Sequence, residues 1–514
     1  MRLNLLITAS EAVPFAKEGG LADVVGILPK FLKTQGHDVR VVMPRYYKVD
    51  RDRYRLRLLP GTLVVPMGII GEMYCGVYEG RLPGSEVPIY FLEHERFYGR
   101  DSLYEVDNKG YIDNDNRFIF LSRASLELCR MIDFAPDIVH AHDWHTAAVP
   151  VFMNTLYRSD HYLKEAASVL TIHNMQHQGS FYEGAMDVLG IGWQHFTHLG
   201  LEMDNQVNLL KGGIYHSTVI NTVSEGYARE MQTPEYGWGL EGVVRERSGE
   251  LCGILNGVDY EEWNPETDPL IPATYSARDL SGKAVCKQEL QRAMGLPERA
   301  DVPLIGLVSR LVKQKGIDVL AEALPRLLAM DVQFVLLGAG EPWAHFYFGG
   351  MAGSHPDRFA CRIGYDNKLA HQIEAGCDFF LMPSAFEPCG LNQMFSLRYG
   401  TIPIVRATGG LDDSVHNLDS GNRTGTGFKF WTLSAGALFD TVGWAVHTWY
   451  HDKEMIEILR QNGMAERFTW DEAAKKYDRL YRHALQARLG AARYAELEAA
   501  RTGQEQEQQE GEGI

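Results

Sequence analysis

The stretch Glu387-Pro388-Cys389-Gly390-Leu391-Asn392-Gln393 stands between an apolar run that predicts a buried strand, residues 377–384, and a predicted helix, residues 394–399. Free backbone N–H groups and the helix dipole at such a junction can receive an anion, and Gly390 lets a ligand approach the main chain. The carboxylate of Glu387 can bind hydroxyl groups beside that anion. These features favour a phosphorylated ligand that carries hydroxyls, such as a nucleotide-sugar. A strand–loop–helix unit without any ligand is also common in α/β proteins, so the stretch alone leaves that alternative open.

Two further segments place charge and glycine just beyond a predicted strand. Ser309-Arg310-Leu311-Val312-Lys313-Gln314-Lys315-Gly316 follows the apolar residues 303–308. Near the N-terminus, Lys17-Glu18-Gly19-Gly20-Leu21-Ala22-Asp23-Val24 follows the predicted strand at residues 3–9. Open α/β sheets bind ligands at the carboxyl ends of their strands, so all three segments are candidate ligand-binding segments.

The size and charge of the chain narrow the class of protein. At 514 residues it exceeds what one hydrophobic core usually supports, so two domains are expected. The formal net charge is −17 and there is no long basic stripe, which argues against a nucleic-acid partner because binding of the phosphate backbone needs clustered Lys and Arg. A phosphorylated small molecule is still allowed, since local cations can oppose the global sign of the charge.

The cysteines and the N-terminus bear on the compartment. The seven cysteines form no C-x-x-C pair, and their odd number fits reduced thiols better than a disulfide framework. The N-terminus enters a predicted strand at once, without the layout of a signal peptide, and no apolar run is long enough to span a bilayer. We therefore expect a cytoplasmic protein with no membrane partner.

Strand-like and helix-like segments alternate in both halves of the chain. The alternation starts afresh after Asn256-Gly257-Val258-Asp259, which places the join between two blocks near residues 245–262. Residues 54–92 break the pattern and predict an inserted β-hairpin or small antiparallel sheet. Two βαβ-type blocks predict an α/β fold with two doubly wound, mostly parallel sheets, and chemistry in the cleft between them. The predicted parallel strands are residues 40–44, 138–140, 168–171, 218–221, 304–308, 334–337, 379–382 and 402–405.

Four more motifs occur in order along the chain: His140-Ala141-His142-Asp143-Trp144-His145, Thr171-Ile172-His173-Asn174, Asn256-Gly257-Val258-Asp259 and Thr408-Gly409-Gly410-Leu411. With the three segments above, they resemble the bacterial glycogen synthase and plant starch synthase family of retaining glucosyltransferases, from about Met1 to about Tyr481. The resemblance implies the GT-B fold, in which two Rossmann-like domains face a deep interdomain cleft. It also implies transfer of glucose from ADP-glucose to the non-reducing end of an α-1,4-glucan, such as glycogen or a maltooligosaccharide, without a cofactor.

The resemblance also assigns the parts of the chain. The N-terminal Rossmann-like domain, on the acceptor side, is expected at residues 1–250 and carries the inserted hairpin region. Residues 260–468 are expected to form the nucleotide-sugar domain, and a helix at residues 469–490 to return to the N-terminal domain. The Gln- and Glu-rich tail, residues 500–514, is expected to be disordered.

Two cations are the first catalytic candidates. Breaking the bond between glucose C1 and the diphosphate puts negative charge on the leaving group, so positioned donors are the main catalytic need. Arg310 offers a planar fork for phosphate oxygens and Lys315 a flexible point charge, while the helix start at Leu391 adds backbone donors. The alternative is a pair of solvated loop charges. Lys313 lies nearby but outside the family motif, so it is the control residue for the roles of Arg310 and Lys315.

The N-terminal loop is a second candidate. Lys17, Gly19 and Gly20 resemble the family's nucleotide-sugar loop, in which the glycines permit close main-chain approach and the lysine neutralises the diphosphate or adjusts the sugar. Lys-x-Gly-Gly by itself usually marks only a turn. Glu18 occupies a position that is often threonine in this family.

Glu387 is a candidate nucleophile or general base. The resemblance implies a different role, in which the carboxylate binds glucose hydroxyls and stabilises charge on the ring. Many related two-domain glycosyltransferases carry a second glutamate eight positions later, where this chain has Phe395. Its absence argues against the two-carboxylate double displacement of retaining glycosidases. We expect a front-face mechanism, in which the leaving phosphate accepts the proton of the acceptor.

Histidines and one aspartate complete the catalytic candidates. His173 follows a predicted strand, and the matching histidine of related enzymes contacts the sugar near its primary hydroxyl. A lone histidine at a strand end is also often a hydrogen-bonded structural residue. Asp143 likewise resembles a residue near the reacting face. His140, His142 and His145 have spacing that could bind zinc, but no acidic cluster or cysteine ligand accompanies them, so no metal is expected.

The remaining candidates are substrate-binding residues that the resemblance implies. Tyr365 matches an aromatic that stacks on adenine, and the turn at Thr408, Gly409 and Gly410 is expected to support the distal phosphate through main-chain donors. Asn392 stands where some relatives have threonine. The others lie at the domain join or in the opening stretch: Asn256, Cys389, Gly390 and Leu391.

Two other functions stay open. A same-fold enzyme could use UDP-glucose or another nucleotide-sugar, because Arg310 and Lys315 suit any nucleotide diphosphate. A catalytically silent glucan-binding protein is the second alternative, which the joint presence of Lys17, both cations and Glu387 opposes. No G-x-G-x-x-G follows the first strand, which argues against a Rossmann dehydrogenase.

Overall fold

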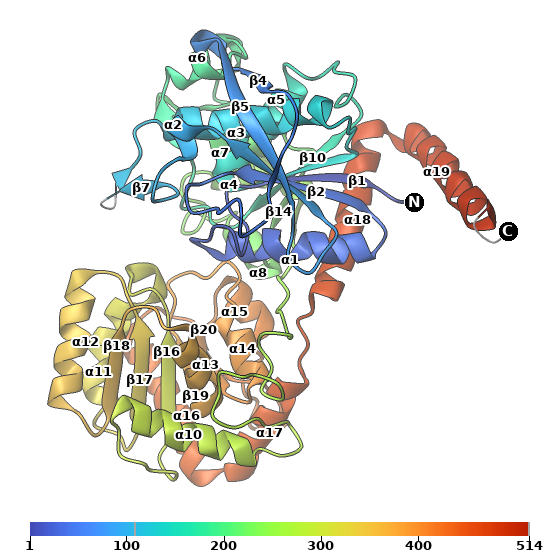
Figure 1. Cartoon of the computed structure of the whole chain (residues 1–514). Coiled ribbons are helices and arrows are strands. Elements are labelled where there is room, and N and C mark those ends of the chain that lie inside the picture. Colours follow the sequence, from blue (N-terminus) through green and yellow to red (C-terminus); the bar gives the residue numbers. More distant parts are fainter. Residues whose placement is uncertain (107–108, 512–514) are drawn as a thin grey trace. The chain divides into compact units, whose positions relative to one another are not determined.

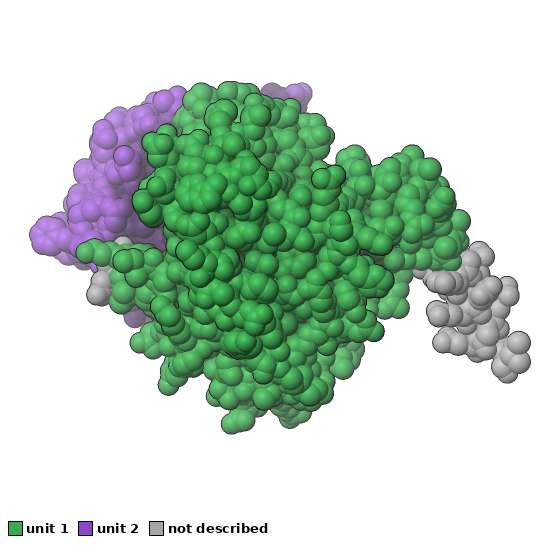
Figure 2. All heavy atoms as spheres, turned by 90° about the horizontal axis from the view of Figure 1, so that it is seen from above, with its two compact units in different colours: residues 1–223, 228–254, 470–514 green, residues 224–227, 255–469 purple. Residues whose placement is uncertain are grey.

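The chain forms two compact units. The computed structural model describes residues 1–106 and 109–511, with side chains up to Thr502. Unit 1 comprises residues 1–223, 228–254 and 470–514, and unit 2 comprises residues 224–227 and 255–469 (Figure 2). The chain thus passes into unit 2 after Ile254, within the predicted join, and re-enters unit 1 at Trp470. None of the helices in the described ranges is long and apolar enough to cross a membrane.

Unit 1 is built on a sheet with the strand order β15-β14-β10-β9-β1-β2-β6-β5-β3, and β4 pairs with β5 (Figure 1). From β15 to β6 all neighbours are parallel. The order along the chain reverses between β1 and β9, which makes a topological switch point where ligands bind in such sheets. The parallel strands are β1 (Asn4–Thr8), β2 (Asp38–Pro44), β6 (Pro88–Glu93), β9 (Ile138–His142), β10 (Ala167–Ile172), β14 (Val219–Thr222) and β15 (Leu251–Gly253).

An antiparallel extension widens this sheet, as the alternation over residues 54–92 predicts. Its strands β3 (Arg57–Leu58) and β4 (Leu63–Pro66) both pair with β5 (Glu72–Arg81), which pairs with β6. Because β6 also pairs in parallel with β2, the extension continues the main sheet instead of forming a separate one. Smaller sheets join β11 (Ser180–Tyr182), β12 (Glu202–Met203) and β13 (Gln206–Asn208), and β7 (Glu105–Val106) with β8 (Lys109–Gly110).

The helix α18 (Trp470–Leu489) belongs to unit 1 although it follows all of unit 2 in sequence. It packs against α1 (Gly20–Thr34), β9 and β10, and buries Tyr477 and Tyr481. The other helical segments of this part of the chain are α2 (Glu95–Tyr98), α3 (Asn114–Met131), α4 (Asp143–Thr146), α5 (Ala148–Asn154), α6 (Ala185–Leu189), α7 (Leu209–His216), α8 (Glu225–Glu230), α9 (Glu241–Glu246), and the 3-10 turns η1 (Gly68–Ile70), η2 (Trp193–His195) and η3 (Ser248–Glu250).

Unit 2 has a parallel sheet with the strand order β18-β17-β16-β19-β20-β21 (Figure 1). Counted along the chain this is the order 3-2-1-4-5-6 of a Rossmann fold, with its switch point between β16 and β19. The strands are β16 (Leu304–Val308), β17 (Gln333–Gly338), β18 (Phe359–Ile363), β19 (Phe379–Met382), β20 (Ile402–Arg406) and β21 (Phe428–Phe430). The prediction of two doubly wound α/β domains is confirmed. The cleft predicted between them is not a property of either unit alone and stays a prediction.

Helices cover both faces of the unit 2 sheet. Ile305 and Leu307 of β16 pack into one apolar cluster with α11 and α16, while Leu304 packs into another with α10 and α13. This alternation follows from the pleat of a strand, and burial on both faces explains the continuous apolar run of β16. The helical segments are α10 (Ser281–Met294), η4 (Lys313–Lys315), α11 (Ile317–Leu327), α12 (Pro342–Ser354), α13 (Asn367–Gly376), α14 (Asn392–Arg398), α15 (Gly409–Ser414), α16 (Ala435–His451) and α17 (Lys453–Ala465).

The expectation of disorder over residues 500–514 stays a prediction. Helix α19 runs from Ala491 to Gly511, and residues 512–514 lie outside the described residues. Glu, Gln, Ala and Arg have high helix propensity, which can extend a helix even where the sequence has no apolar face to bury.

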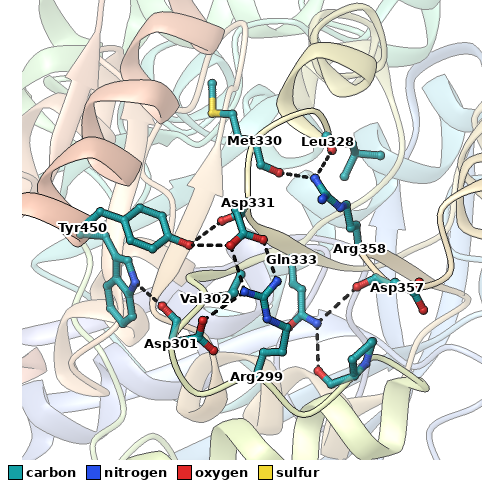
Figure 3. A network of polar contacts seen from close by, with 12 residues as sticks. Arg299, Asp301, Val302, Leu328, Met330, Asp331, Gln333, Asp357, Arg358 and Tyr450 are labelled. Carbon is teal, nitrogen blue, oxygen red and sulfur yellow. Dashed lines mark hydrogen bonds and ion pairs between the residues drawn. The ribbon is translucent and has the colours of Figure 1, made fainter.

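Polar contacts join the loops at the amino ends of the unit 2 strands (Figure 3). Arg299 donates to both carboxylate oxygens of Asp331, at 2.7 and 2.9 Å, and to Asp301 at 3.0 Å. Arg358 donates to the carbonyls of Leu328 and Met330 at 2.8 and 2.6 Å. The Arg299 ion pairs are exposed to solvent, so each contributes little to stability. Together these contacts hold the loops at the amino ends of the strands. The carboxyl ends, where ligands bind at a switch point, form the opposite edge of the sheet.

Glu374 gives unit 2 a testable dependence of stability on pH. It lies buried in α13, accepts a hydrogen bond from Ser396 at 2.6 Å, and burial raises its pKa from 4.5 to about 8. Between these values the unfolded chain releases a proton that the folded chain keeps, so the stability present below pH 4.5 is lost as pH rises. We expect Glu374→Gln to raise the melting temperature relative to wild type, by an amount that grows from pH 5 to pH 7. The underlying change is at most about 1.4 kcal/mol per pH unit.

Exposed Glu322 on α11 provides the control. Glu322→Gln removes an exposed carboxylate and should leave the melting temperature close to that of the wild type. A difference between Glu374→Gln and wild type that does not change with pH would contradict the assignment to Glu374.

Candidate functional site

A pocket of about 220 Å³ lies at the switch point of unit 2. The loop after β16 contributes Arg310 and Lys315, and the loop after β19 contributes Glu387. The structure therefore brings together the two segments that the sequence analysis singled out in this half of the chain. The residues that line the pocket are Leu307, Val308, Ser309, Arg310, Lys315, Leu381, Met382, Pro383, Ser384, Glu387, Gly390, Leu391 and Asn392.

Lys315 and Glu387 form an ion pair inside this pocket. The Lys315 ammonium lies 2.6 Å from Glu387 Oε2, which also accepts a hydrogen bond from the Ser384 hydroxyl at 3.1 Å. Only 8% of the Glu387 side chain is exposed, against 19% for Lys315. The carboxylate is thus held in one orientation with its charge balanced, while two further N–H donors of the ammonium have no partner among the described residues and can bind an anion.

Gly316 explains how Lys315 reaches that place. It has a φ of 67°, and a Cβ on it would lie 1.9 Å from the Pro383 carbonyl oxygen. Only glycine fits a left-handed turn pressed against another backbone. The end of η4 can therefore pack directly on the exit of β19, and this sets Lys315 beside Glu387.

Arg310 is exposed at the pocket, where its Nη2 donates to Gln314 Oε1 at 3.2 Å. That contact uses one of the five N–H donors of the guanidinium, and no other hydrogen bond of this side chain is present within the described residues. A guanidinium with unused donors matches the bidentate geometry of phosphate oxygens.

The stretch after Glu387 makes contacts within unit 2 that hold the start of α14. The Asn392 side chain donates to the Val308 carbonyl at 2.8 Å and so ties α14 to β16. Cys389 is buried, which raises the pKa of its thiol to about 12, so the thiol stays protonated. Gly390 has a φ of 71°, which favours glycine, and Leu391 is the residue before α14. Both line the pocket, and their predicted ligand contacts stay predictions.

The Thr408–Gly409–Gly410 turn supports the Glu387 turn. A Cβ on Gly409 would meet the Glu387 carbonyl at 2.2 Å, and one on Gly410 would meet the Cys389 carbonyl at 2.0 Å. The Gly410 N–H donates to the Glu387 carbonyl at 3.0 Å. That hydrogen bond holds the turn against the Glu387 backbone, and the expectation that main-chain donors of this turn support the distal phosphate stays a prediction. Thr408 is the N-cap residue before α15 (Gly409–Ser414) and does not line the pocket.

Asn256 and Tyr365 do not line the pocket either. Asn256 is buried and its backbone lies in hydrogen-bond contact with Cys389. Tyr365 follows β18 and is 88% exposed, with its hydroxyl 3.2 Å from Asn367 Oδ1. An exposed ring at a strand end is free to stack on a planar ligand, which is the role that the resemblance implies.

At the switch point of unit 1, a buried carboxylate holds the Lys17 loop. Glu11 accepts hydrogen bonds from the backbone N–H groups of Glu18 and Gly19, at 2.5 and 3.1 Å, and burial raises the pKa of Glu11. Lys17 pairs with Asp23 at 2.7 Å, and Gly20 begins α1. None of the sequence motifs pointed to Glu11. The signal that could have found it is an acid placed directly after an apolar strand and within a largely apolar segment.

Asp143 and His173 meet at the same edge of the unit 1 sheet. Asp143 has a φ of 54°, and its carboxylate accepts from the His173 N–H at 2.6 Å and from the Asn174 backbone. Burial raises the pKa of Asp143 to about 7 and lowers the pKa of His173 to about 3. His173 is therefore neutral at pH 7, and Asp143 fixes the turn that carries it.

The other histidines of this motif form contacts with protein groups. His140 lies between the Tyr481 hydroxyl, 2.9 Å from Nδ1, and the Thr171 hydroxyl, 2.6 Å from Nε2. His142 contacts His173, and the His145 ring stacks on Tyr104 at 4.5 Å. Throughout the described ranges, no group of three His, Cys, Asp or Glu side chains is arranged to hold a metal ion.

Two protein-family models and several known proteins match this chain. The family described as starch synthase catalytic domain matches residues 4–246, and the family described as glycosyl transferases group 1 matches residues 292–462. Glycogen synthase 1 of Geobacter metallireducens is 70% identical over 494 residues, covering 96% of this chain and 98% of that protein. The chain belongs to the glycogen and starch synthase family.

Two further proteins, another glycogen synthase and a starch synthase of known structure, match the chain over most of its length. Glycogen synthase 1 of Geobacter sulfurreducens is 72% identical, covering 95% of this chain and 98% of its own. The catalytic domain of starch synthase IV from Arabidopsis thaliana, solved with ADP and acarbose bound, has a TM-score of 0.86 and 34% identity, covering 95% of this chain and 100% of that one. The family and the GT-B fold expected from the sequence are confirmed.

A larger pocket of about 450 Å³ lies at the amino-end edge of unit 2 and is lined by Lys283 and Lys287 among others. The Lys283 ammonium donates to two carbonyls and a hydroxyl, at 2.7–3.1 Å. The Lys287 ammonium pairs with Asp378 at 2.8 Å and donates to two carbonyls. All three donors of each ammonium are used, so these lysines stabilise the fold. The switch-point pocket, whose cations keep unused donors, is the better site for a diphosphate.

Proposed function

We propose that this chain transfers glucose from ADP-glucose to the non-reducing end of an α-1,4-glucan, with retention of configuration at C1. The observation that carries the proposal is the switch-point pocket of unit 2, where Arg310, Lys315 and Glu387 converge. A diphosphate needs cations with unused donors, and a sugar needs an oriented carboxylate. This pocket offers both within a few ångströms.

In the proposed reaction, the bond between glucose C1 and the diphosphate oxygen breaks and its electron pair stays on the diphosphate. Lys315 and Arg310 stabilise that charge because they are in place before it develops. The acceptor hydroxyl attacks C1 from the same face, and its proton passes to a phosphate oxygen of the leaving group. The products are ADP and a glucan longer by one glucose.

Glu387 supports this front-face route better than double displacement. Its carboxylate is paired with Lys315 and bonded to Ser384, an arrangement for binding hydroxyls and balancing charge. The second glutamate that a two-carboxylate scheme needs is replaced by Phe395. The Phe395 ring stacks on Trp263 with centroids 4.0 Å apart and is buried in unit 2.

The other candidates have roles that combine the resemblance with the contacts in the structure. In this proposal Lys17, with Gly19 and Gly20, contacts the donor, while His173 contacts the sugar. Asp143 holds the turn of His173, which the hydrogen bond to its N–H supports. Asn256, Cys389, Gly390, Leu391, Asn392, Thr408, Gly409 and Gly410 shape the donor pocket or the turns that build it.

The nucleotide base is the part of the proposal that needs a direct test. Arg310 and Lys315 bind any nucleotide diphosphate, so they do not distinguish ADP-glucose from UDP-glucose. Incubation with labelled ADP-glucose and a maltooligosaccharide, followed by sizing of the products, should show stepwise extension. We expect kcat/KM for ADP-glucose to exceed that for UDP-glucose by at least about tenfold, as one good base contact would give. Equal activity would contradict the donor assignment, and no extension with either donor would favour the silent glucan-binding alternative.

Tyr365 offers a further prediction for base recognition. If its exposed ring stacks on adenine, Tyr365→Ala should raise KM for ADP-glucose by about tenfold and change kcat less than about twofold, because base binding is the same in the ground and transition states. Tyr450 is a partly exposed tyrosine of the same unit that donates to the Asp331 carbonyl at the amino-end loops, away from β18, and Tyr450→Ala is the control. An unchanged KM in Tyr365→Ala would remove Tyr365 from the donor site.

We also propose that the enzyme works in the cytoplasm. All seven cysteines are free thiols, and five of them are buried. Such thiols are stable in a reducing compartment.

A further inference from the structure

The ring of His142 contacts the ring of His173, the histidine proposed to bind the sugar. Nδ1 of His142 lies 2.9 Å from Nε2 of His173, and the two rings stack with centroids 5.3 Å apart. His142 ends β9 and His173 follows β10, and these strands are neighbours in the sheet. The contact is therefore set by the register of the sheet.

Both rings are neutral at pH 7. Burial lowers the pKa of His142 well below its ordinary value, and burial likewise lowers the pKa of His173 to about 3. A neutral imidazole has one N–H donor and one nitrogen lone pair. In the pair, one ring must donate and the other must accept, and the choice decides where each ring carries its proton.

The second nitrogen of His142 decides between the two arrangements. His142 is fully buried, and its Nε2 has no hydrogen-bond partner among the residues that the structure describes. If His142 accepted at Nδ1, its proton would sit on Nε2 as a buried N–H without an acceptor. If it donates from Nδ1, only a lone pair is left unpaired. Buried N–H groups without partners are rarer than under-used acceptors, so the second arrangement is favoured.

We propose that His142 donates from Nδ1 to Nε2 of His173 and thereby fixes the proton of His173 on Nδ1. His142 is then a positioning residue: it does not touch the substrate, but it sets which nitrogen of His173 is the donor. The Nδ1–H of His173 suits an oxygen acceptor such as a sugar hydroxyl. That last step rests on the proposed function, whereas the position of the proton does not.

His140 holds His142 without competing for its proton. The two rings lie 4.1 Å apart, and both nitrogens of His140 already have hydroxyl partners, Tyr481 and Thr171. The backbone N–H of His142 donates to the Thr146 hydroxyl at 2.7 Å. His140 is thus as deeply buried as His142 and has no hydrogen bond to His173 within the described part of the chain, which makes it a matched control.

The direct test is the ¹⁵N NMR spectrum of the whole enzyme labelled at its histidine rings, at pH 7. Nitrogens that carry a proton and those that do not have widely separated shifts, and the signals of His173 are identified by their loss in His173→Gln. We expect a protonated Nδ1 and an unprotonated Nε2 for His173 in the wild type. A protonated Nε2, or an averaged pair of signals, would overturn the proposal, and this result needs no enzymatic activity.

Three variants separate positioning from packing. His142→Phe keeps a buried ring without a donor, so the His173 signals should become averaged and kcat should fall about tenfold, the effect of one hydrogen bond. His142→Gln keeps an N–H donor and should recover most of that loss. His140→Phe should lower the melting temperature but leave the His173 signals as in the wild type.

The outcomes are distinct. Unchanged His173 signals in His142→Phe, or averaged signals in His140→Phe, would contradict the role of His142. If the proton lies on Nδ1 and the enzyme transfers no glucose, the proposed function fails while the inference about His142 stands.

Discussion

Lys315→Ala is expected to lower kcat by about 10²–10³-fold, the usual effect of removing one positioned donor from a developing negative charge. The ammonium lies in the switch-point pocket with donors unused by protein, so it acts on the departing diphosphate. KM for ADP-glucose should change much less than kcat, because the charge is larger in the transition state than in the bound donor. Steady-state rates of glucan extension give both quantities.

Arg310→Ala should behave in the same way, and Lys313→Ala is the control for both. Lys313 is exposed in the same turn but is not part of the pocket lining, so its replacement should change kcat less than about twofold. The competing interpretation treats all three as solvated loop charges. It predicts equal, small effects for the three variants. A large loss of activity accompanied by loss of folding, measured by the melting temperature, would assign Lys315 a structural role instead.

Glu387→Gln is expected to lower kcat by about 10²-fold or more. Glutamine keeps the shape and can still accept from Ser384, but it removes the negative charge that faces Lys315 at 2.6 Å and would stabilise the sugar ring. Glu374→Gln, a change at an equally buried glutamate away from the pocket, should leave kcat close to wild type. Near-normal transfer by Glu387→Gln would remove this carboxylate from the site.

The double variant tests whether the pair acts as a unit. If Lys315 and Glu387 depend on each other, Lys315→Ala with Glu387→Gln should be little slower than the slower single variant. If each acts alone on its own part of the donor, the two losses should multiply. The second result would contradict the coupling that the ion pair indicates.

Much of the fold was predictable because it depends on local pattern. Apolar runs followed by glycine and charge marked the strand ends of both sheets, and Gly316 and Lys315 stand where that pattern places them. The positions of the switch points follow from the strand order. The sequence does not state this order directly, but a doubly wound fold requires it. The sequence pattern therefore predicted which edge of each sheet carries the candidate site residues.

Partner choice was not predictable in the same way. Lys315 and Glu387 are 72 positions apart, and their contact depends on the β16–β19 pairing. The hydrogen bond from the Gly410 N–H to the Glu387 carbonyl likewise joins two motifs that lie apart in sequence, because α15 packs on the Glu387 turn. The contacts of Glu11 with the Lys17 loop and of His142 with His173 were not predicted. The sequence does not indicate which buried polar groups will form hydrogen bonds with each other.

The late position of α18 has a consequence for how the protein is made. Residues 255–469 are contiguous, so unit 2 is complete as soon as they leave the ribosome, apart from the short 224–227 segment that precedes them. Unit 1 begins synthesis first but lacks the helix that covers α1, β9 and β10 until residues 470–489 emerge. Until then, the apolar surface of unit 1 that α18 covers stays exposed to solvent. Unit 2, although it is translated later, can finish folding first.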